Sequence, residues 1–292
     1  MSNYLIDMHC HTTASDGSLT PTEIIKLAKE SGLKAIAITD HDTTDGIDEA
    51  LKAGEKYNIE VIKGIEFAAL YDTDTELEIH ILGYFIDHKN KKFKEVLKSI
   101  TEARENRNIL MVEKLRKIGI DITIEDVNED AGGEIITRAH FANVLQKKGY
   151  VKSKNEAFSY FLSPGKAGYV RREFVTPKVC IDAIKNAGGA AFLAHPTLYK
   201  MSYEQIEKAL KHLKELGLVG VESEYSTYST EQERNIKKIA KKLDLLISGG
   251  SDFHGSYKPD IKLGVGMGNL KIPYEYAEKI KFSILQHFVS QY

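Results

Sequence analysis

The sequence predicts an α/β fold in which parallel strands alternate with helices, and two observations indicate it. First, short apolar, β-branched runs alternate with amphipathic stretches, as they do where buried parallel strands are joined by helices. Second, helix-start signals fall between the runs. Thr20-Pro21-Thr22-Glu23 combines a capping threonine, a proline at the first helical position and a capping-box glutamate, and Thr176-Pro177 repeats the first two. The candidate strands are residues 4–9, 34–39, 60–65, 79–85, 190–194, 219–222 and 245–248.

Length and composition restrict the class of protein further. The 292 residues are 42% hydrophobic and 28% charged, which fits a globular protein and argues against disorder, collagen and coiled coil. No apolar run approaches the ~20 residues that a membrane span needs, and the start of the chain lacks a secretory signal pattern. Two cysteines, Cys10 and Cys180, are too few for a disulfide framework. We therefore expect a cytoplasmic protein.

The alternation of strands and helices stops between the fourth and fifth candidate strands. Residues 89–175 instead show a long amphipathic stretch at 91–117 and two shorter ones near 138–148 and 153–161, which predict helices. The sequence therefore predicts a barrel made of residues 1–88 and 176–292, interrupted by a small helical insertion at 89–175.

Charge is unevenly distributed along the chain. Residues 89–176 contain 18 Lys and Arg against 12 Asp and Glu, whereas the remainder contains 22 basic against 30 acidic residues. Six of the seven arginines lie in this basic segment, and only Arg234 lies outside it. The excess of about six positive charges predicts a local anion site rather than a general nucleic-acid surface.

Histidines and carboxylates recur at the carboxyl ends of the candidate strands or in the loops that follow them. Because side chains alternate along a strand, His9 and His11 face one way and Cys10 the other, so Cys10 is expected to be structural. A parallel barrel brings the carboxyl ends of its strands to one face. His80 fits this rule least well, because it lies near the start of its strand and would need a shifted boundary or a bulge.

The ligand chemistry indicates a metal site. Taken singly, each group could be a capped turn or a packed strand end. It is improbable, however, that six of the seven candidate strands carry a His, Asp or Glu at or near their ends by chance. Imidazole and carboxylate without thiolate favour Zn, Mn or Fe over a Cys-rich structural zinc. Nine such groups exceed what one ion uses, so two or three ions are expected, with a carboxylate such as Glu66 bridging them.

These motifs resemble the four-part signature of the PHP (polymerase and histidinol phosphatase) superfamily. The matching segments are His9-Cys10-His11, Ser15-Asp16-Gly17, Thr39-Asp40-His41-Asp42, Gly64-Ile65-Glu66, Ala194-His195-Pro196 and Ser251-Asp252-Phe253-His254. The resemblance implies a distorted (βα)7 barrel. The insertion, with Ile136-Thr137-Arg138-Ala139-His140 and Pro164-Gly165-Lys166-Ala167-Gly168-Tyr169-Val170, is similar to the branch that contains nucleoside 3′,5′-bisphosphate phosphatases and 5′–3′ exoribonucleases.

The resemblance implies a site for three divalent ions, with Mn, Fe or Zn as candidates. The first ion would take His9, His11, Glu66 and Asp252, the second would share Glu66 and add His80 and His195, and the third would take Asp16, His41 and His254. A carboxylate at Asp16, where some relatives have histidine, favours Mn or Fe over Zn. Asp40 and Asp42 are candidates for carboxylates that orient histidines. No side-chain nucleophile is expected beyond a metal-bound hydroxide.

The basic insertion supplies candidates for substrate binding. Arg104 and Arg107 lie three residues apart on a predicted helix, so their guanidinium groups share a face and could grip a terminal phosphate. Arg138 and Lys166 are further candidates. The alternative is that these are solvated helix charges.

Together these features predict a metal-dependent phosphoesterase that removes the 3′-phosphate of a nucleoside 3′,5′-bisphosphate. A short 5′-phosphorylated RNA in the same site would make the protein a 5′–3′ exoribonuclease instead. Histidinol phosphatase is a weaker alternative, because its small substrate gives the basic insertion no evident task. A non-catalytic nucleic-acid-binding module is the alternative from another class. Neither a membrane nor an obligate protein partner is expected.

Overall fold

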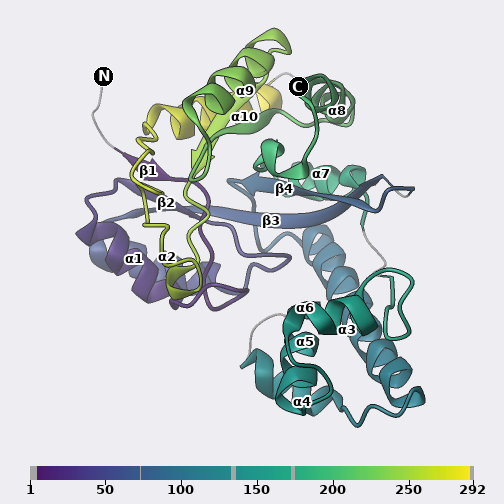
Figure 1. Ribbon diagram of the computed structural model, residues 1–292. Coiled ribbons are helices and arrows are strands. Elements are labelled where there is room, and N and C mark those ends of the chain that lie inside the picture. The colour runs from purple at the N-terminus through teal and green to yellow at the C-terminus, as the bar shows by residue number, and fades with distance from the viewer. Residues whose placement is uncertain (1–4, 73, 133–135, 172–174, 290–292) are drawn as a thin grey trace. The chain divides into compact units, whose positions relative to one another are not determined.

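The seven strands form one sheet whose spatial order follows the sequence, as the computed structural model shows for residues 5–72, 74–132, 136–171 and 175–289 (Figure 1). They are β1 (Ile6–Asp7), β2 (Ala35–Ile38), β3 (Glu60–Asp72), β4 (Leu77–Tyr84), β5 (Ala190–Leu193), β6 (Gly220–Tyr225) and β7 (Leu246–Gly250). The segment after β1 also reaches β7, because the Met8 N–H donates to the Gly249 carbonyl at 3.3 Å. The sheet is therefore a nearly closed α/β barrel, which confirms the predicted fold class.

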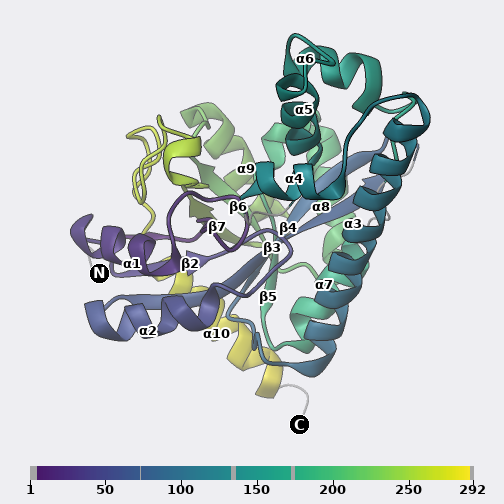
Figure 2. The ribbon, with the colours of Figure 1, turned by 90° about the horizontal axis from the view of Figure 1, so that it is seen from below.

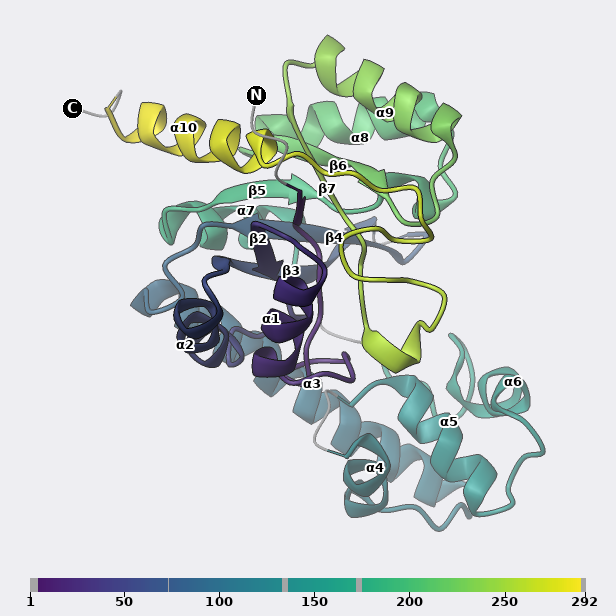
Figure 3. The same ribbon diagram turned by 90° about the vertical axis from the view of Figure 1, so that its left-hand side faces the viewer.

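Helices cover the outside of this barrel. They are α1 (Pro21–Glu30), α2 (Ile47–Tyr57), α7 (Pro177–Asn186), α8 (Tyr203–Glu215), α9 (Thr230–Lys242) and α10 (Glu275–Val289). Helices α1 and α2 lie side by side next to β2 and β3 (Figure 2), and α9 packs on β6 and β7 beside α8 (Figure 3). The predicted start of α1 is confirmed, since Thr20 and Glu23 form a reciprocal capping box. Among the described helices, none is both long and apolar enough to cross a membrane.

One strand runs in the opposite direction to the prediction. β1, β2 and β3 are mutually parallel, as are β5, β6 and β7, but β4 pairs antiparallel with both β3 and β5. The expectation of a parallel fourth strand at 79–85 is therefore wrong. The physical reason is that β3 continues well past Ile65 to Asp72 and connects to β4 without a helix. Two strands joined by a tight turn must be antiparallel.

The barrel is filled by alanine and isoleucine together with larger side chains such as Tyr84 and Phe192, which explains why its strands are apolar. All four residues of β2 and all four of β5 are buried. Helix α10 adds Ala277 and Ile280 to the same core cluster. At the start of β3, the Glu60 carboxylate accepts from Lys281 and Tyr274, both at 2.5 Å. The amino ends of the strands are thus packed closed, which leaves the carboxyl ends for polar groups.

The chain divides into two compact units, residues 1–97 with 175–292 and residues 98–174. The boundary falls inside α3 (Lys91–Lys117), whereas the sequence analysis placed the insertion at 89–175. The smaller unit also contains α4 (Ile124–Ala131), α5 (Arg138–Lys147), α6 (Lys154–Ala157) and a π-helix at Phe158–Leu162.

The smaller unit has a hydrophobic core of its own, in which Leu115, Val127, Phe141 and Leu162 are fully buried. Helix α4 was not expected from the sequence. It is only eight residues long, although Ile124, Val127 and Ala131 recur at helical spacing and the last two are buried. Its start nevertheless carries a capping box between Thr123 and Asp126. The predicted helix at 153–161 is a single α-turn followed by the π-helix.

Candidate metal centre

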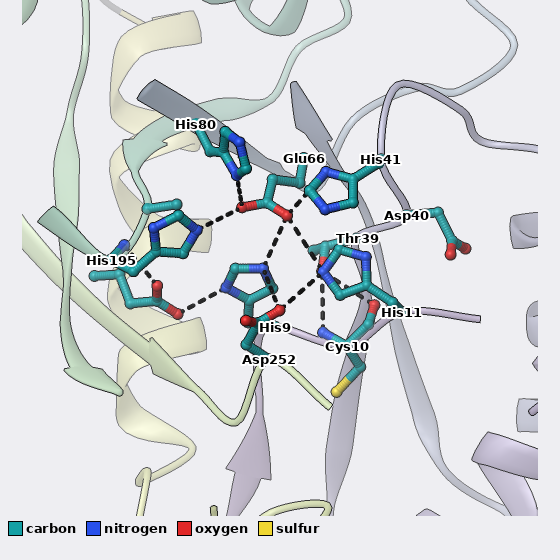
Figure 4. A network of polar contacts seen from close by, with 12 residues as sticks. His9, Cys10, His11, Thr39, Asp40, His41, Glu66, His80, His195 and Asp252 are labelled. Carbon is teal, nitrogen blue, oxygen red and sulfur yellow. Dashed lines mark hydrogen bonds and ion pairs between the residues drawn. The ribbon is translucent and has the colours of Figure 1, made fainter. Parts of the chain in front are cut away.

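The carboxylate of Glu66, which lies on β3, occupies the middle of the polar cluster at the carboxyl end of the barrel (Figure 4). Its Oε1 atom lies 2.9 Å from His80 Nδ1 and 3.0 Å from His195 Nε2. The side chain is 1% exposed. One oxygen of a buried carboxylate therefore faces histidines from two different strands.

The other oxygen of Glu66 faces three more histidines. Oε2 lies 3.2 Å from each of His9 Nε2, His11 Nε2 and His41 Nδ1. His9 and His11 follow β1, and His41 follows β2. Five imidazoles from four places in the chain thus surround one carboxylate, as the sequence pattern predicted for the strand ends.

The reversed direction of β4 explains how His80 joins this group. Because β4 is antiparallel, its start lies at the same edge of the sheet as the carboxyl ends of the other strands. His80 pairs with Ala68 in the register, two residues beyond Glu66 on the same face of the hairpin. Its backbone N–H donates to the Tyr199 hydroxyl at 2.7 Å. The antiparallel direction of β4 therefore brings His80 into the site without the bulge that a parallel strand would need.

Local sequence accounts for the positions of the first two histidines. His9 and His11 point into the cluster and the Cys10 sulfur points away from it, as expected (Figure 4). The ring centroids of His9 and His11 are 5.2 Å apart. A side chain at Gly250 would place its Cβ 2.4 Å from the Cβ of His9. Glycine in the Gly249-Gly250-Ser251 segment is therefore required by close packing against His9.

A second group of ligand-type atoms lies around Asp16. Its carboxylate oxygens are 3.4 Å from His11 Nδ1, 3.4 Å from His254 Nε2 and 3.8 Å from His41 Nε2. The Asp16 side chain is 37% exposed, whereas that of His11 is fully buried. The polar cluster therefore has a buried floor around Glu66 and an open rim at Asp16.

Asp252 completes the floor of the cluster, and its two oxygens have different surroundings. Oδ1 lies 3.2 Å from His11 Nε2 and 3.5 Å from His9 Nε2. Oδ2 accepts hydrogen bonds from the Tyr225 hydroxyl and from Lys258 Nζ, both at 2.6 Å. Asp252 is thereby oriented with one oxygen toward the histidines.

The arrangement fits divalent ions on chemical grounds. Three groups of residues each offer ligand atoms within 4.8 Å of one another: His9, His11, Glu66 and Asp252; His11, Asp16, His41 and His254; and His41, Glu66 and His80. The buried Nε2 atoms of His9 and His11 have no hydrogen-bond partner of good geometry. A buried polar nitrogen left without a partner costs roughly 1–3 kcal/mol. A cation bound between these nitrogens and the carboxylates would remove that cost.

The electrostatics of the cluster favour ionised carboxylates. Burial alone would raise the pKa of Glu66, but the surrounding imidazoles, His9 first, hold it well below its usual value. Burial opposes the charged form of the histidines as well. Even so, Glu66 and Glu78 raise the pKa of His80 to about 10, and Asp252 and Glu66 raise that of His11 to about 9. Burial lowers the pKa of His41 to about 4.

Asp40 and Asp42 were predicted to orient histidines, and their observed contacts are to the loops of the site. Asp40 accepts from the Thr12 N–H at 2.7 Å, from the Thr12 hydroxyl at 2.8 Å and from the Ser15 hydroxyl at 2.6 Å. It thereby fixes the turn between His11 and Asp16. Asp42 accepts from the Ala68 N–H at 3.1 Å, which ties the loop after β2 to β3.

The sequence analysis assigned no site residue to the sixth strand, yet β6 contributes two. Glu222 contacts His9 Nδ1 at 3.0 Å, and Tyr225 donates to Asp252. Glu222 was missed because it was read as the last residue of a buried strand. The signal was available, since a glutamate that ends an apolar strand obeys the same rule that identified Glu66.

The four predicted substrate-binding residues all belong to the smaller unit. Arg104 and Arg107 lie on α3 and are buried, and Arg107 donates to the Ile136 carbonyl at 3.3 Å. The guanidinium group of Arg138, at the start of α5, lies over the Tyr169 ring at 5.6 Å from its centroid. Lys166 is exposed in the loop after the π-helix.

Comparison with known proteins gives consistent results. The PHP domain matches residues 7–157 of this chain. The chain is 37% identical to the 5′-3′ exoribonuclease of Haemophilus influenzae, over 85% of this chain and 89% of that protein. It is 36% identical to the 5′-3′ exoribonuclease Rnm of Escherichia coli, over 90% of both. It is 34% identical to the 3′,5′-nucleoside bisphosphate phosphatase of Chromobacterium violaceum, over 85% of this chain and 87% of that protein.

Solved structures show the same architecture. A protein of Bifidobacterium adolescentis that is assigned as a metal-dependent phosphoesterase superposes with a TM-score of 0.75, at 31% identity over 94% of both chains. A Chromobacterium violaceum protein described as an amidohydrolase superposes with a TM-score of 0.74, at 33% identity over 89% of both chains.

Proposed function

Because this chain belongs to the PHP domain family and is a metal-dependent phosphoesterase, we propose that it removes the 3′-phosphate of nucleoside 3′,5′-bisphosphates. The observation that carries the proposal is the carboxylate of Glu66 with five histidines around it at 2.9–3.2 Å. Imidazole nitrogens that give up their protons on metal binding, together with ionised carboxylate oxygens, suit several divalent cations at once.

We propose three ions, of Mn, Fe or Zn, with Glu66 shared between the first two. The ligands of the first are His9, His11, Glu66 and Asp252, those of the second are Glu66, His80 and His195, and those of the third are Asp16, His41 and His254. The groups described above support the first set and include the whole of the third. The second set is supported by the contacts of Glu66 Oε1 with His80 at 2.9 Å and His195 at 3.0 Å, whereas the corresponding group contains His41 in place of His195. Residue 16 is an aspartate rather than a histidine, and a carboxylate ligand favours Mn or Fe as the third ion.

When bound, such ions neutralise the phosphoryl oxygens and make water nucleophilic near neutral pH. The residues of the chain provide the setting for that chemistry. Glu66, His9 and His11 are at most 1% exposed, so the floor excludes bulk water and strengthens electrostatic interactions. The side chains of His41 and His80 at the rim are each 23% exposed, which leaves a route for the substrate.

We propose that the retained 5′-phosphate is bound by Arg104 and Arg107, with Arg138 and Lys166 in support. The two arginines are on one face of α3, and guanidinium groups bind phosphate in a bidentate manner. The net positive charge of the insertion supports the same assignment. A bisphosphate would then have one phosphate cleaved and the other held.

A second candidate function is 5′–3′ exoribonuclease activity on short 5′-phosphorylated RNA. The Haemophilus influenzae and Escherichia coli relatives carry that name, and at 37% and 36% identity they are slightly more similar to this chain than the bisphosphate phosphatase is at 34%. In both reactions a phosphate ester at a ribose 3′-oxygen is hydrolysed. The two candidates differ only in the length of the nucleotide chain that the site must accept.

The test is a direct comparison of three substrates with the Mn-loaded protein. Adenosine 3′,5′-bisphosphate, a 5′-phosphorylated trinucleotide RNA and histidinol phosphate are assayed under the same conditions for released phosphate and nucleotide. We expect turnover of the bisphosphate, and of the trinucleotide if the second candidate holds as well. Turnover of histidinol phosphate alone would overturn the proposal.

A further inference from the structure

Glu222 is a fully buried carboxylate on β6 that contacts two of the site histidines at once. Its Oε1 lies 3.0 Å from His9 Nδ1, and its Oε2 accepts the backbone N–H of His195 at 2.8 Å. His9 follows β1 and His195 follows β5. One side chain thus links two residues that reach the site from different strands.

The contact with His9 determines which nitrogen of that ring is available to a ligand. A carboxylate can only accept, so Nδ1 must carry a proton toward Glu222. In the neutral ring the lone pair then lies on Nε2, the atom that faces Glu66 at 3.2 Å and Asp252 at 3.5 Å. Glu222 therefore selects the His9 tautomer whose free nitrogen points into the cluster.

The contact with His195 restrains the backbone. His195 has φ +27° and ψ +55°, a left-handed conformation that a residue with a Cβ seldom adopts. Such strain persists only where the surroundings hold it in place. The hydrogen bond from the His195 N–H to Glu222 is one such restraint. The conformation leaves the ring with Nε2 at 3.0 Å from Glu66 Oε1.

A carboxylate is required because both contacts need an acceptor. The isosteric amide of glutamine has one acceptor oxygen and one donor nitrogen. If its oxygen accepts from His195, its nitrogen faces Nδ1 and forces the proton of His9 onto Nε2. If its oxygen faces His9 instead, its nitrogen opposes the His195 N–H. Either orientation weakens one of the two histidines as a ligand.

We propose that Glu222 is a positioning residue that presents His9 and His195 together to the metal ions. The proposal rests on the proposed metal centre and extends it to a residue outside the ligand set. Strand β6 supplies none of the proposed ligands. Its role is to hold His9, which follows β1, and His195, which follows β5, in position through Glu222.

The test compares Glu222→Gln with Glu224→Gln, a matched control two residues away on the same strand. In the described contacts Glu224 pairs with Tyr276 at 2.5 Å and Lys237 at 2.6 Å rather than with a site histidine. Zn²⁺ is titrated into the metal-free proteins against a chromophoric chelator, which reports affinity and stoichiometry without any substrate. We expect Glu222→Gln to weaken at least one binding step by roughly 10–100-fold and Glu224→Gln to leave every step unchanged. Equal affinities in Glu222→Gln and wild type would overturn the proposal.

A second measurement needs no variant and therefore does not depend on the folding of Glu222→Gln. In the Zn-loaded wild-type protein with ¹⁵N-labelled histidine, the His9 ring should carry its proton on Nδ1 and a metal-shifted Nε2 resonance. A His9 ring protonated on Nε2 would overturn the proposal. Neither readout uses a nucleotide, so loss of the proposed bisphosphatase activity and loss of the Glu222 role are distinguishable.

Discussion

The two compact units of this chain differ in where their charged groups lie. In the barrel unit, carboxylates and imidazoles gather at one place and are largely buried, with Glu66 in contact with five rings. In the smaller unit, basic residues are distributed over α3, α5 and a loop, and the main core cluster is formed by apolar side chains. The difference indicates a division of labour. Changes in the barrel should affect the turnover of every substrate, and changes in the smaller unit should affect only how particular substrates bind.

The largest effect is expected for Glu66→Gln. The substitution removes the charge that all five histidines face, so bound metal and activity should both fall. The loss should exceed the roughly 10–100-fold that is typical of residues that only orient a ligand. Metal content is measured by elemental analysis after reconstitution with Mn²⁺, and turnover is measured on each substrate in parallel. A fully active Glu66→Gln protein would be incompatible with a shared ligand.

A smaller effect is expected for Asp16→Asn at the exposed rim. The site histidines that this carboxylate contacts are His11, His41 and His254, and water can replace an exposed oxygen ligand. We expect one equivalent of metal to be lost and activity to fall, by less than in Glu66→Gln because the other two ions keep their ligands. The number of metal ions bound per chain is compared between Asp16→Asn and Glu66→Gln. A smaller loss in Asp16→Asn would show that the ion at the rim binds separately from those at the floor around Glu66. Loss of all metal in Asp16→Asn would show that the two parts do not bind ions independently.

Arg104→Ala tests the other side of the comparison. A charge-assisted hydrogen bond contributes about 1.5–3 kcal/mol, so KM for substrates with a 5′-phosphate should rise at least about tenfold while kcat changes little. Arg116→Ala is the matched control, since Arg116 lies on the same helix and is exposed. Arg104→Lys tests whether the planar guanidinium is needed. An equal rise in KM for adenosine 3′-phosphate, which lacks the 5′-phosphate, would assign Arg104 another role.

The smallest effect is a dependence of metal binding on pH. In the metal-free protein the pKa of His11 is about 9 and that of His80 about 10, so both rings are protonated at pH 7.5. Ions must displace these protons, and affinity should therefore rise as pH increases toward 9–10. Calorimetric titration with Zn²⁺ in buffers of different ionisation enthalpy should show net proton release. Zero release at pH 7.5 would contradict the raised pKa values.

The same shifts predict the stability of the metal-free barrel. A histidine whose pKa is raised in the folded state stabilises it fully below the unfolded value of about 6.5. That contribution is lost progressively as pH rises from about 6.5 to the folded-state pKa values of about 9 for His11 and about 10 for His80. Thermal unfolding of the metal-free protein should therefore show a Tm that declines between about pH 6.5 and pH 10.

Much of the barrel and its cluster was predictable, because both depend on local patterns. Buried strands are apolar runs, and a ligand after a strand end reaches the face where strand ends meet, as His41 and His195 show. The direction of β4 was not predictable from periodicity, since a buried strand has the same pattern in either direction. That is also why His80 looked misplaced in the sequence.

The sequence did not predict how residues behind the proposed ligands contact them. The position of Glu222 at the end of an apolar run marks it as a candidate site residue, but its role depends on the two groups that its oxygens contact, and those come from residues 9 and 195. Helix α4 is only eight residues long, so its three apolar residues at helical spacing are a brief signal, although its capping box at Thr123 and Asp126 was visible. Arg104 and Arg107 are visible as a helical pair, but their roles depend on a substrate rather than on a pattern.

The left-handed backbone at Asp42, His195 and Asp252 has a consequence for evolution and engineering. Each such residue costs on the order of 1–3 kcal/mol, so the barrel tolerates conformational strain where its chemistry is concentrated. Selection for thermal stability alone would favour glycine or asparagine at these positions, and it would therefore replace residues of the polar cluster. Thermostable variants of this enzyme should therefore be sought in the helices, with these three positions held constant.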